Sequence, residues 1–191
     1  MKDFARVALV LALLMPFLSA DAGVSKRDCA CAVTGGVFVD SLFRAIPADL
    51  INIDKARQKA RPAALDRPNG FMSVTYRDQS GNDIEYTAAL YTGGPKNKRV
   101  FLIIAREMHY IAQLPFTEGF WIFEYNSGKC ADVTDELRPW TNTGGLVKLP
   151  RRGTDISVCA NEGDDRGIRE VCAVYAWDLA GARFREKKGK K

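Results

Sequence analysis

Five cysteines constrain this chain more than any other feature of its sequence. Cys29 and Cys31 stand one residue apart near the start, and Cys130, Cys159 and Cys172 follow in the second half. Cysteines form disulfides in exported proteins, whereas in the cytosol they stay thiols or bind metals, so their role depends on the compartment. The residues in front of Cys29 therefore have to be interpreted first.

Residues 1–22 have the three parts of a secretory signal. Lys2 and Arg6 supply a positive start, residues 7–18 are apolar, and residues 20–22 (ADA) match the small-x-small cleavage pattern. The apolar run is shorter than the roughly 18 to 20 residues that a membrane-spanning helix needs. We therefore expect a cleaved signal peptide, a secreted or periplasmic protein, and no transmembrane segment in the mature chain.

The length of the mature chain suits one domain, which we place at residues 23–185, followed by a basic tail without fixed structure at residues 186–191. The net charge of the protein is +5, and the stretch from Arg183 to the end holds six basic residues and one acid. The remaining domain is neutral, which argues against a nucleic-acid partner. Two interpretations of the tail stay open: a solubilising end, which we favour, and a weak contact with anionic envelope surfaces.

The pattern of apolar residues predicts an α+β fold, with an N-terminal helical segment packed on a largely antiparallel β-meander and braced by disulfides. Apolar residues recur at steps of three and four between Asp40 and Arg61, with Asp40 as the expected N-cap and Pro62 as the stop. Pro47 is expected to kink this helix or divide it in two. A further helical turn is expected to begin at Thr134.

Short runs of β-branched and aromatic residues follow Gly70, separated by turns rich in glycine, asparagine and aspartate. Two of the runs are apolar at successive positions, which indicates central strands covered on both faces. The expected strands are 71–77, 84–91, 99–105, 108–114, 119–125, 146–149, 154–160, 171–177 and 182–185.

Motif searches argue against most enzyme classes. The chain has one histidine, His109, and lacks the GxSxG, GxxxxGK[ST], GxGxxG and HExxH patterns. We predict no cofactor, no metal site and no catalytic residues, and we lean against an enzyme. An alternative that these counts leave open is a small secreted hydrolase with His109 as the base of a dispersed site.

The sequence offers three candidate binding residues. Trp140 lies in a predicted loop, where its ring either packs over a sheet edge or is offered to a partner. Arg151 and Arg152 follow in a second loop and have the donor geometry to bind a carboxylate or phosphate. A solvated turn explains the two arginines as well.

The cysteine pairing follows partly from strand register. A hairpin turning at residues 165–166 sets Cys159 opposite Cys172 and aligns the apolar residues of both strands on one face. Cys130 is then expected to pair with Cys29 or Cys31, because a bond between Cys29 and Cys31 themselves would close a small, strained ring. The fifth cysteine is expected to stay free or to link two chains.

These features favour a secreted or periplasmic, non-enzymatic protein that binds another macromolecule, such as an inhibitor or an immunity protein. The expected partner is a protein or a ligand of the cell envelope. The alternatives are the small hydrolase using His109 and an envelope structural factor held by its basic tail.

Overall fold

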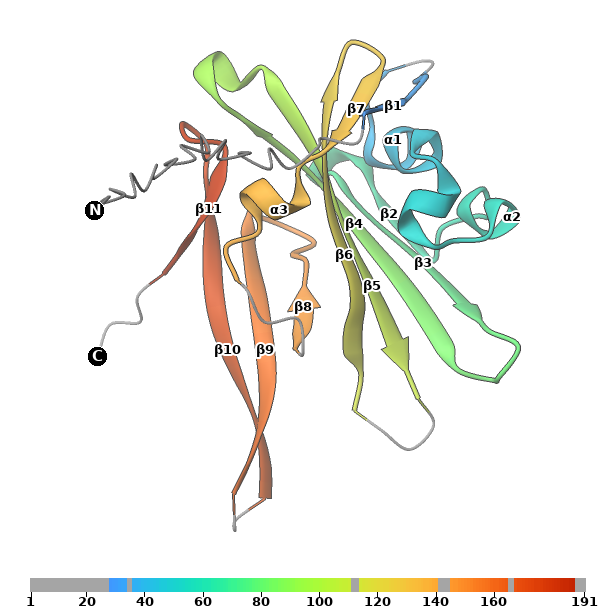
Figure 1. Cartoon of the computed structure of the whole chain (residues 1–191), viewed down its shortest axis with the longest axis vertical. Helices are drawn as coiled ribbons and strands as arrows, with labels where there is room; N and C mark the ends of the chain where they lie inside the picture. The colour runs from blue at the N-terminus through green and yellow to red at the C-terminus, as the bar shows by residue number, and fades with distance from the viewer. Residues whose placement is uncertain (1–27, 34–35, 111–113, 141–144, 165–166, 188–191) are drawn as a thin grey trace, which may run out of the picture.

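The computed structural model describes most of the chain as two antiparallel β-sheets, with the helical pieces of residues 39–58 on the face of the larger sheet that points away from the smaller sheet (Figure 1). The expected signal peptide and the end of the tail lie outside the described residues. The described ranges are 28–33, 36–110, 114–140, 145–164 and 167–187.

The larger sheet has seven strands in the order β1-β7-β6-β5-β4-β3-β2. Strands β2 to β7 are neighbours in chain order, as in a meander, and β1 joins the sheet beside β7. β5 is one continuous strand, so the expected break between residues 105 and 108 is wrong. The strands are β1 (Asp28–Ala30), β2 (Ala64–Asp66), β3 (Phe71–Arg77), β4 (Asp83–Gly93), β5 (Arg99–His109), β6 (Phe116–Asn126) and β7 (Lys129–Asp132).

The smaller sheet has four strands in the order β11-β10-β9-β8. Its central hairpin has Cys159 opposite Cys172 and Ala173 opposite Val158, the register expected from the sequence. Its last strand runs through Glu186, and the backbone N–H of Lys187 donates to Val174, so the tail starts later than expected. The strands are β8 (Leu146–Lys148), β9 (Asp155–Asp164), β10 (Gly167–Asp178) and β11 (Arg183–Glu186).

The expected helical segment is divided at Pro47, which is one of the two outcomes expected there, and is divided again near Asn52. It therefore forms three short pieces: α1 (Val39–Ala45), η1 (Ala48–Ile51) and α2 (Lys55–Gln58). Ile46 is extended because it precedes Pro47, and Asn52 is left-handed, so neither residue continues a helix. The chain is therefore mostly β, and the α+β class is not well supported. The remaining helices are η2 (Arg67–Asn69), η3 (Pro95–Asn97) and α3 (Thr134–Leu137).

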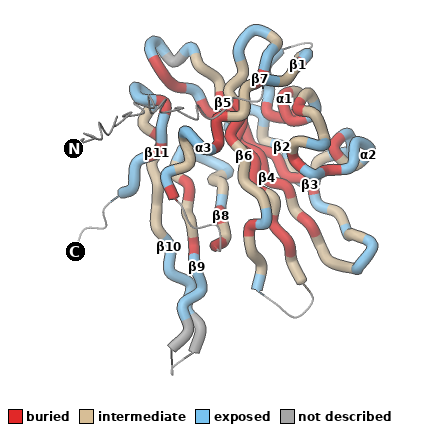
Figure 2. The backbone as a smooth tube through the Cα atoms, viewed as in Figure 1, coloured by how far each residue is buried: buried red, intermediate tan, exposed pale blue. Residues whose placement is uncertain are grey.

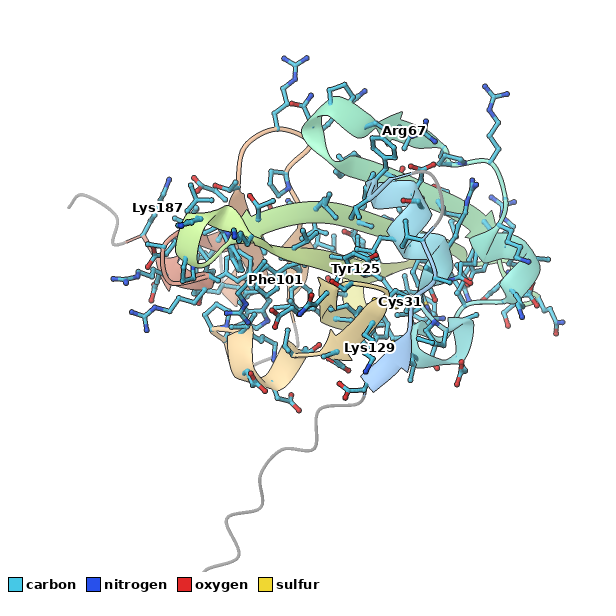
Figure 3. All side chains as sticks on the ribbon, turned by 90° about the horizontal axis from the view of Figure 1, so that it is seen from above. Cys31, Arg67, Phe101, Tyr125, Lys129 and Lys187 are labelled. Atoms are coloured by element: carbon cyan, nitrogen blue, oxygen red, sulfur yellow. A yellow bond between two sulfur atoms is a disulfide. The ribbon has the colours of Figure 1, made fainter. Side chains whose placement is uncertain are left out.

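Asp40 is not the N-cap that the sequence suggested. Helix α1 is capped at Phe38, whose backbone N–H donates to Ser41 Oγ at 2.9 Å. Asp40 lies in the first turn, buried, and its carboxylate accepts two hydrogen bonds from Arg67 at 3.0 and 2.6 Å. Figure 3 shows Arg67 beside the helix. This guanidinium lowers the pKa of Asp40.

The seven-stranded sheet is covered on both faces, which gives the described part of the molecule two apolar cores. Buried residues gather along its central strands (Figure 2). On the helix face, residues such as Leu102, Ile104 and Phe123 pack with α1 and η1. On the inner face, Phe101 and Ile103 belong to the core shared with the four-stranded sheet. The expectation that β5 and β6 are central strands is confirmed, since successive side chains of a strand alternate between its two faces.

The helical pieces are tied to the sheet by a buried phenol. The hydroxyl of Tyr86 on β4 lies 3.0 Å from the carbonyl oxygen of Ile51 and 2.7 Å from that of Asn52, at the end of η1. Burial raises the pKa of Tyr86 above its usual value, so the phenol stays a neutral donor. Every helix in the described part of the chain is too short or too polar to cross a bilayer.

Candidate functional site

The inner face of the seven-stranded sheet carries a group of charged side chains at one end. Glu85 on β4 lies directly opposite Glu107 on β5, and His109 follows two residues along β5. One ligating atom from each of the three side chains lies within 4.8 Å of the other two, and His109 Nε2 is 3.7 Å from Glu107 Oε2. We call these residues the Glu–Glu–His cluster.

The two-residue period of a strand explains how apolar packing and this cluster share β5. Phe101, Ile103 and Ala105 point to the inner face and are buried in its core. Glu107 and His109 continue the same row of alternate residues beyond the apolar part. The cluster therefore combines two side chains of β5 with Glu85 of the adjacent strand β4.

A β-bulge on β6 brings a further polar side chain to this end of the inner face. The register of β5 and β6 shifts between Arg106 and Glu107, so that Thr117 lies opposite Glu107. Thr117 Oγ accepts a hydrogen bond of 2.7 Å from the backbone N–H of Val147 in β8. The bulge thereby joins the seven-stranded sheet to the first strand of the four-stranded sheet beside the cluster.

Burial changes the protonation of one member of the cluster, Glu107. Glu107 is 9% exposed, and the pKa of its carboxyl is raised from 4.5 to about 7, mainly by desolvation. The negative charge of Glu85 contributes to this rise, and the positive charge of Lys148 on β8 opposes it. Glu107 therefore changes its charge near neutral pH.

A buried hydroxyl lies next to the cluster. Thr87 stands two residues from Glu85 on β4, on the same face, and is diagonal to Glu107 across the ladder. Thr87 is 9% exposed, and its hydroxyl has no hydrogen-bond partner among the described residues. A buried hydroxyl without a partner costs free energy, which a further polar group at the site would offset.

The binding residues that we expected from the sequence are dispersed. Trp140 is 7% exposed and packs between Phe120 and Tyr175, with ring centroids 5.0 and 5.2 Å away. Of the two alternatives for Trp140, the structure has the packed ring, although its edge lines a surface depression with Arg138. A binding role for Trp140 remains a prediction.

Arg151 and Arg152 are exposed, on the segment that follows β8. Arg151 Nε lies 3.4 Å from a carboxylate oxygen of Asp66 at the end of β2, so this arginine makes an ion pair with the edge of the larger sheet. Trp140, in contrast, belongs to the core between the two sheets. The three expected residues therefore do not form one compact site, and binding by Arg151 and Arg152 remains untested.

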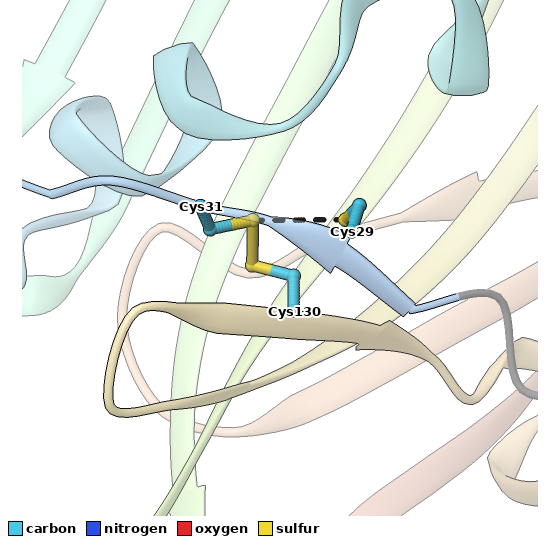
Figure 4. Close-up of side chains that lie close together, drawn as sticks. All are labelled: Cys29, Cys31 and Cys130. Carbon is cyan, nitrogen blue, oxygen red and sulfur yellow. Dashed lines mark hydrogen bonds between the residues drawn. A yellow bond between two sulfur atoms is a disulfide. The ribbon is translucent and has the colours of Figure 1, made fainter.

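Two disulfides brace the chain, Cys31–Cys130 and Cys159–Cys172, and both pairings are among those expected from the sequence. Cys29 keeps a free thiol, although Cys29 is the residue directly opposite Cys130 in the ladder of β1 and β7. Its sulfur lies 3.7 Å from that of Cys31 (Figure 4). Burial and neighbouring carboxylates raise the pKa of the Cys29 thiol.

Sequence reasoning missed Glu85, Glu107 and Thr87. It considered His109 alone and placed that residue on a separate strand, because the charged pair Arg106–Glu107 reads as a break between two apolar runs. A usable signal was present in the alternation along β5, where Phe101, Ile103 and Ala105 share a row with Glu107. The opposition of Glu85 and Glu107 additionally requires the hairpin register.

Comparisons of the chain with protein-family models, with curated proteins and with solved structures gave no match.

Proposed function

We propose that this protein is an exported, non-enzymatic binding protein that holds a segment of a partner protein, as inhibitors and immunity proteins do. The observation that carries the proposal is a disulfide-braced hairpin arm with an apolar groove at its base. The arm consists of residues 160–164 of β9 and 167–171 of β10, on the far side of the two bonded cysteines.

The arm extends beyond the other strands of the molecule (Figure 1). Within the described residues, β8 pairs with β9 only as far as Cys159, and β11 pairs with β10 only from Tyr175 onward. The Cys159–Cys172 bond joins the two strands where the arm begins. A binding element that is rigid before contact loses less conformational entropy on binding, which supports a recognition role for the arm.

The groove beside the arm has an apolar floor and a charged rim. Leu114 and Pro115 precede β6, and with Leu146 on β8 they supply the apolar lining of a depression of about 490 Å³. Lys148 and Glu170 line it as well, and their side chains form an ion pair of 2.7 Å that connects β8 with the arm.

One exposed large apolar side chain, Leu114, lies in this groove, and another, Val171, lies on the arm beside it. Leu114 is 51% exposed, and Val171 on the arm is 39% exposed. Because the charges of Lys148 and Glu170 are already paired, the groove suits an apolar side chain of a partner better than a charged one. A protein segment with such an anchor residue is therefore the partner class that we propose.

Site-specific photo-crosslinking in cells tests this function. A photoreactive residue at Leu114 or Val171 should give one discrete adduct with a partner protein. Leu65 and Leu179 are matched controls, since they are 39% and 49% exposed and lie outside the groove. Adducts of equal yield from all four positions, or none from any, would contradict the proposal.

A binding assay with the captured partner completes the test. The substitution Leu114→Arg should weaken the complex at least tenfold, because it places a charge at the apolar floor, whereas Leu179→Arg should leave the affinity unchanged. Equal affinities of both variants would remove the groove from consideration.

Export forms part of the proposal. Its support is the signal pattern of residues 1–22 together with two disulfides, which are typical of oxidising compartments. Cell fractionation should recover a chain that starts at Gly23 outside the cytoplasm. A cytoplasmic chain that retains residues 1–22 would contradict export.

A further inference from the structure

We propose that the Glu–Glu–His cluster is a binding site for a divalent transition-metal ion, with Zn²⁺ as the ion that fits its ligands best. The site is formed by Glu85, Glu107 and His109 on the inner face of β4 and β5. The inference does not depend on the partner-binding function proposed above.

The positions of the ligand atoms suit a small cation. Three atoms that lie within 4.8 Å of one another enclose a point about 2.8 Å or less from each. Zinc binds carboxylate oxygen and imidazole nitrogen at about 2.0 to 2.2 Å, so small side-chain rotations complete the coordination. The backbone needs no movement, because opposed residues on adjacent strands already converge.

The donor set separates transition metals from the alkaline-earth ions. Calcium and magnesium prefer six or more oxygen ligands, many of them water or carbonyl groups. One imidazole with two carboxylates instead suits zinc and its neighbours in the first transition row. Three protein ligands leave the fourth tetrahedral position open, and His109, whose side chain is 40% exposed, lies toward solvent. We expect water in that position.

The charge of the cluster also favours a bound cation. Glu85 and Glu107 lie directly opposite each other, and like charges in opposed positions destabilise a sheet. The ammonium group of Lys148 on β8, whose charge acts on Glu107, forms its ion pair with Glu170. A bound divalent ion would turn the repulsion between the two carboxylates into shared coordination.

The buried hydroxyl of Thr87 is the independent observation that points to a ligand. It lies beside both carboxylates on the same face, 9% exposed, with no partner in the described part of the chain. Residues around metal ligands commonly hydrogen-bond to ligating carboxylates or to metal-bound water. Thr87 is placed to donate to the carboxylate of Glu85 or Glu107 once the ion fixes its orientation.

Two other groups of potential ligands are less suitable. One contains Cys31 and Cys130, and the other contains Cys159 and Cys172. In each group two sulfurs are joined in a disulfide, and a disulfide sulfur is not the thiolate that binds zinc. Cys29 is the thiol that must be controlled for in any binding experiment.

Calorimetric titration of the chelator-treated full protein with ZnCl₂ tests the site. We expect one ion per chain in the unmodified protein. The variants Glu107→Gln and His109→Gln should each weaken binding by about tenfold or more, since each removes one ligand. Cys29→Ala and Glu118→Gln should bind zinc as the unmodified protein does, because the Glu118 carboxylate pairs with Arg106. MgCl₂ and CaCl₂ should give no saturable binding.

Three results would overturn the inference: no saturable zinc binding, unchanged binding in both ligand variants, or loss of binding in Cys29→Ala. Circular dichroism must show that the ligand variants are folded. If a variant unfolds, anomalous diffraction at the zinc edge from crystals of the unmodified protein decides, with a peak expected between the three side chains. A peak elsewhere, or none, rejects the site.

Discussion

The helix face and the inner face of β5 belong to the same eleven residues and yet differ in character. On the helix face, Leu102, Ile104 and Met108 extend one apolar core along the strand. On the inner face, the apolar row ends at Ala105 and continues with Glu107 and His109. A single strand thus supports two packed layers and a polar cluster, because alternate residues belong to independent surfaces.

The largest expected effect is a loss of stability, and it tests whether the apolar cores on the two faces of β5 contribute equally to the free energy of unfolding. Ile103 and Ile104 are neighbours, both fully buried, one on each face. Each substitution to alanine should lower the free energy of unfolding by about 2 to 5 kcal/mol, because it leaves a cavity in a packed layer. Urea denaturation of the two variants measures the costs. A cost below about 1 kcal/mol for Ile103→Ala would show that the two sheets pack loosely.

The second prediction concerns the covalent link on the helix face. Replacing both Cys29 and Cys31 with alanine should lower the free energy of unfolding by roughly 2 to 4 kcal/mol, because the Cys31–Cys130 bond spans 99 residues. Cys31→Ala alone should cost less, since Cys29 lies opposite Cys130 and can replace its partner. Non-reducing peptide mapping of the single variant should find Cys29 bonded to Cys130. A free Cys130 would contradict this prediction.

A third variant tests the polar contact of α1 on the helix face. Arg67→Ala should cost about 1 to 3 kcal/mol, because it leaves the buried carboxylate of Asp40 without its guanidinium partner. Arg77→Ala is the matched control, since its ion pair with Asp83 is exposed and contributes little. Thermal denaturation of both variants provides the comparison. Equal losses of stability would show that the buried pair of Arg67 and Asp40 contributes no more than the exposed pair.

The smallest effect belongs to the inner face and depends on pH. The pKa of Glu107 is about 7 in the folded protein, against 4.5 as its usual value, so the folded state binds this proton more tightly. The resulting stabilisation is complete below about pH 4.5 and is lost as the pH rises through 7. In chelator-treated protein, we expect this titration to lower the free energy of unfolding by about 1 to 2 kcal/mol between low and high pH, a figure discounted for partial solvation.

Denaturation of the unmodified protein and of Glu107→Gln at pH 5 and pH 8 measures this effect. Glu85, His109 and Lys148 face Glu107 in both proteins, so the difference between the two isolates its titration. The glutamine variant should be the less pH-dependent of the two. An equal loss of stability in both would assign the effect to another group.

The sequence predicted the parts of the fold that depend on short-range patterns. The hairpin of β9 and β10 followed from its turn residues and from matching apolar rows, and the residues of β3 were predicted without error. The break of the helical segment at Pro47 was predicted, but the second break at Asn52 was not, because apolar spacing of three and four residues persists through short helical pieces. The division into two sheets depends on contacts between distant strands, which local patterns do not contain.

The candidate site was less accessible to prediction. Glu85 and Glu107 are 22 positions apart in the sequence, and only the register of the long hairpin of β4 and β5 sets them opposite each other. The burial that perturbs Glu107 comes from a second layer that the sequence did not predict. His109 was identified because it is the single histidine, which is a feature of composition and not of structure.

The β-bulge at Glu118 also determines which changes in chain length the molecule can accommodate. It reverses the alternation of β6, so that odd-numbered Phe123 and even-numbered Phe116 both pack on the helix face. Deleting Glu118 would restore a regular ladder while leaving Thr117 opposite Glu107. Deleting a residue from the middle of β6 would instead turn one half of the strand over, exchanging core and surface residues. The bulge is therefore the one position on β6 where losing a residue should preserve the facing of every other side chain.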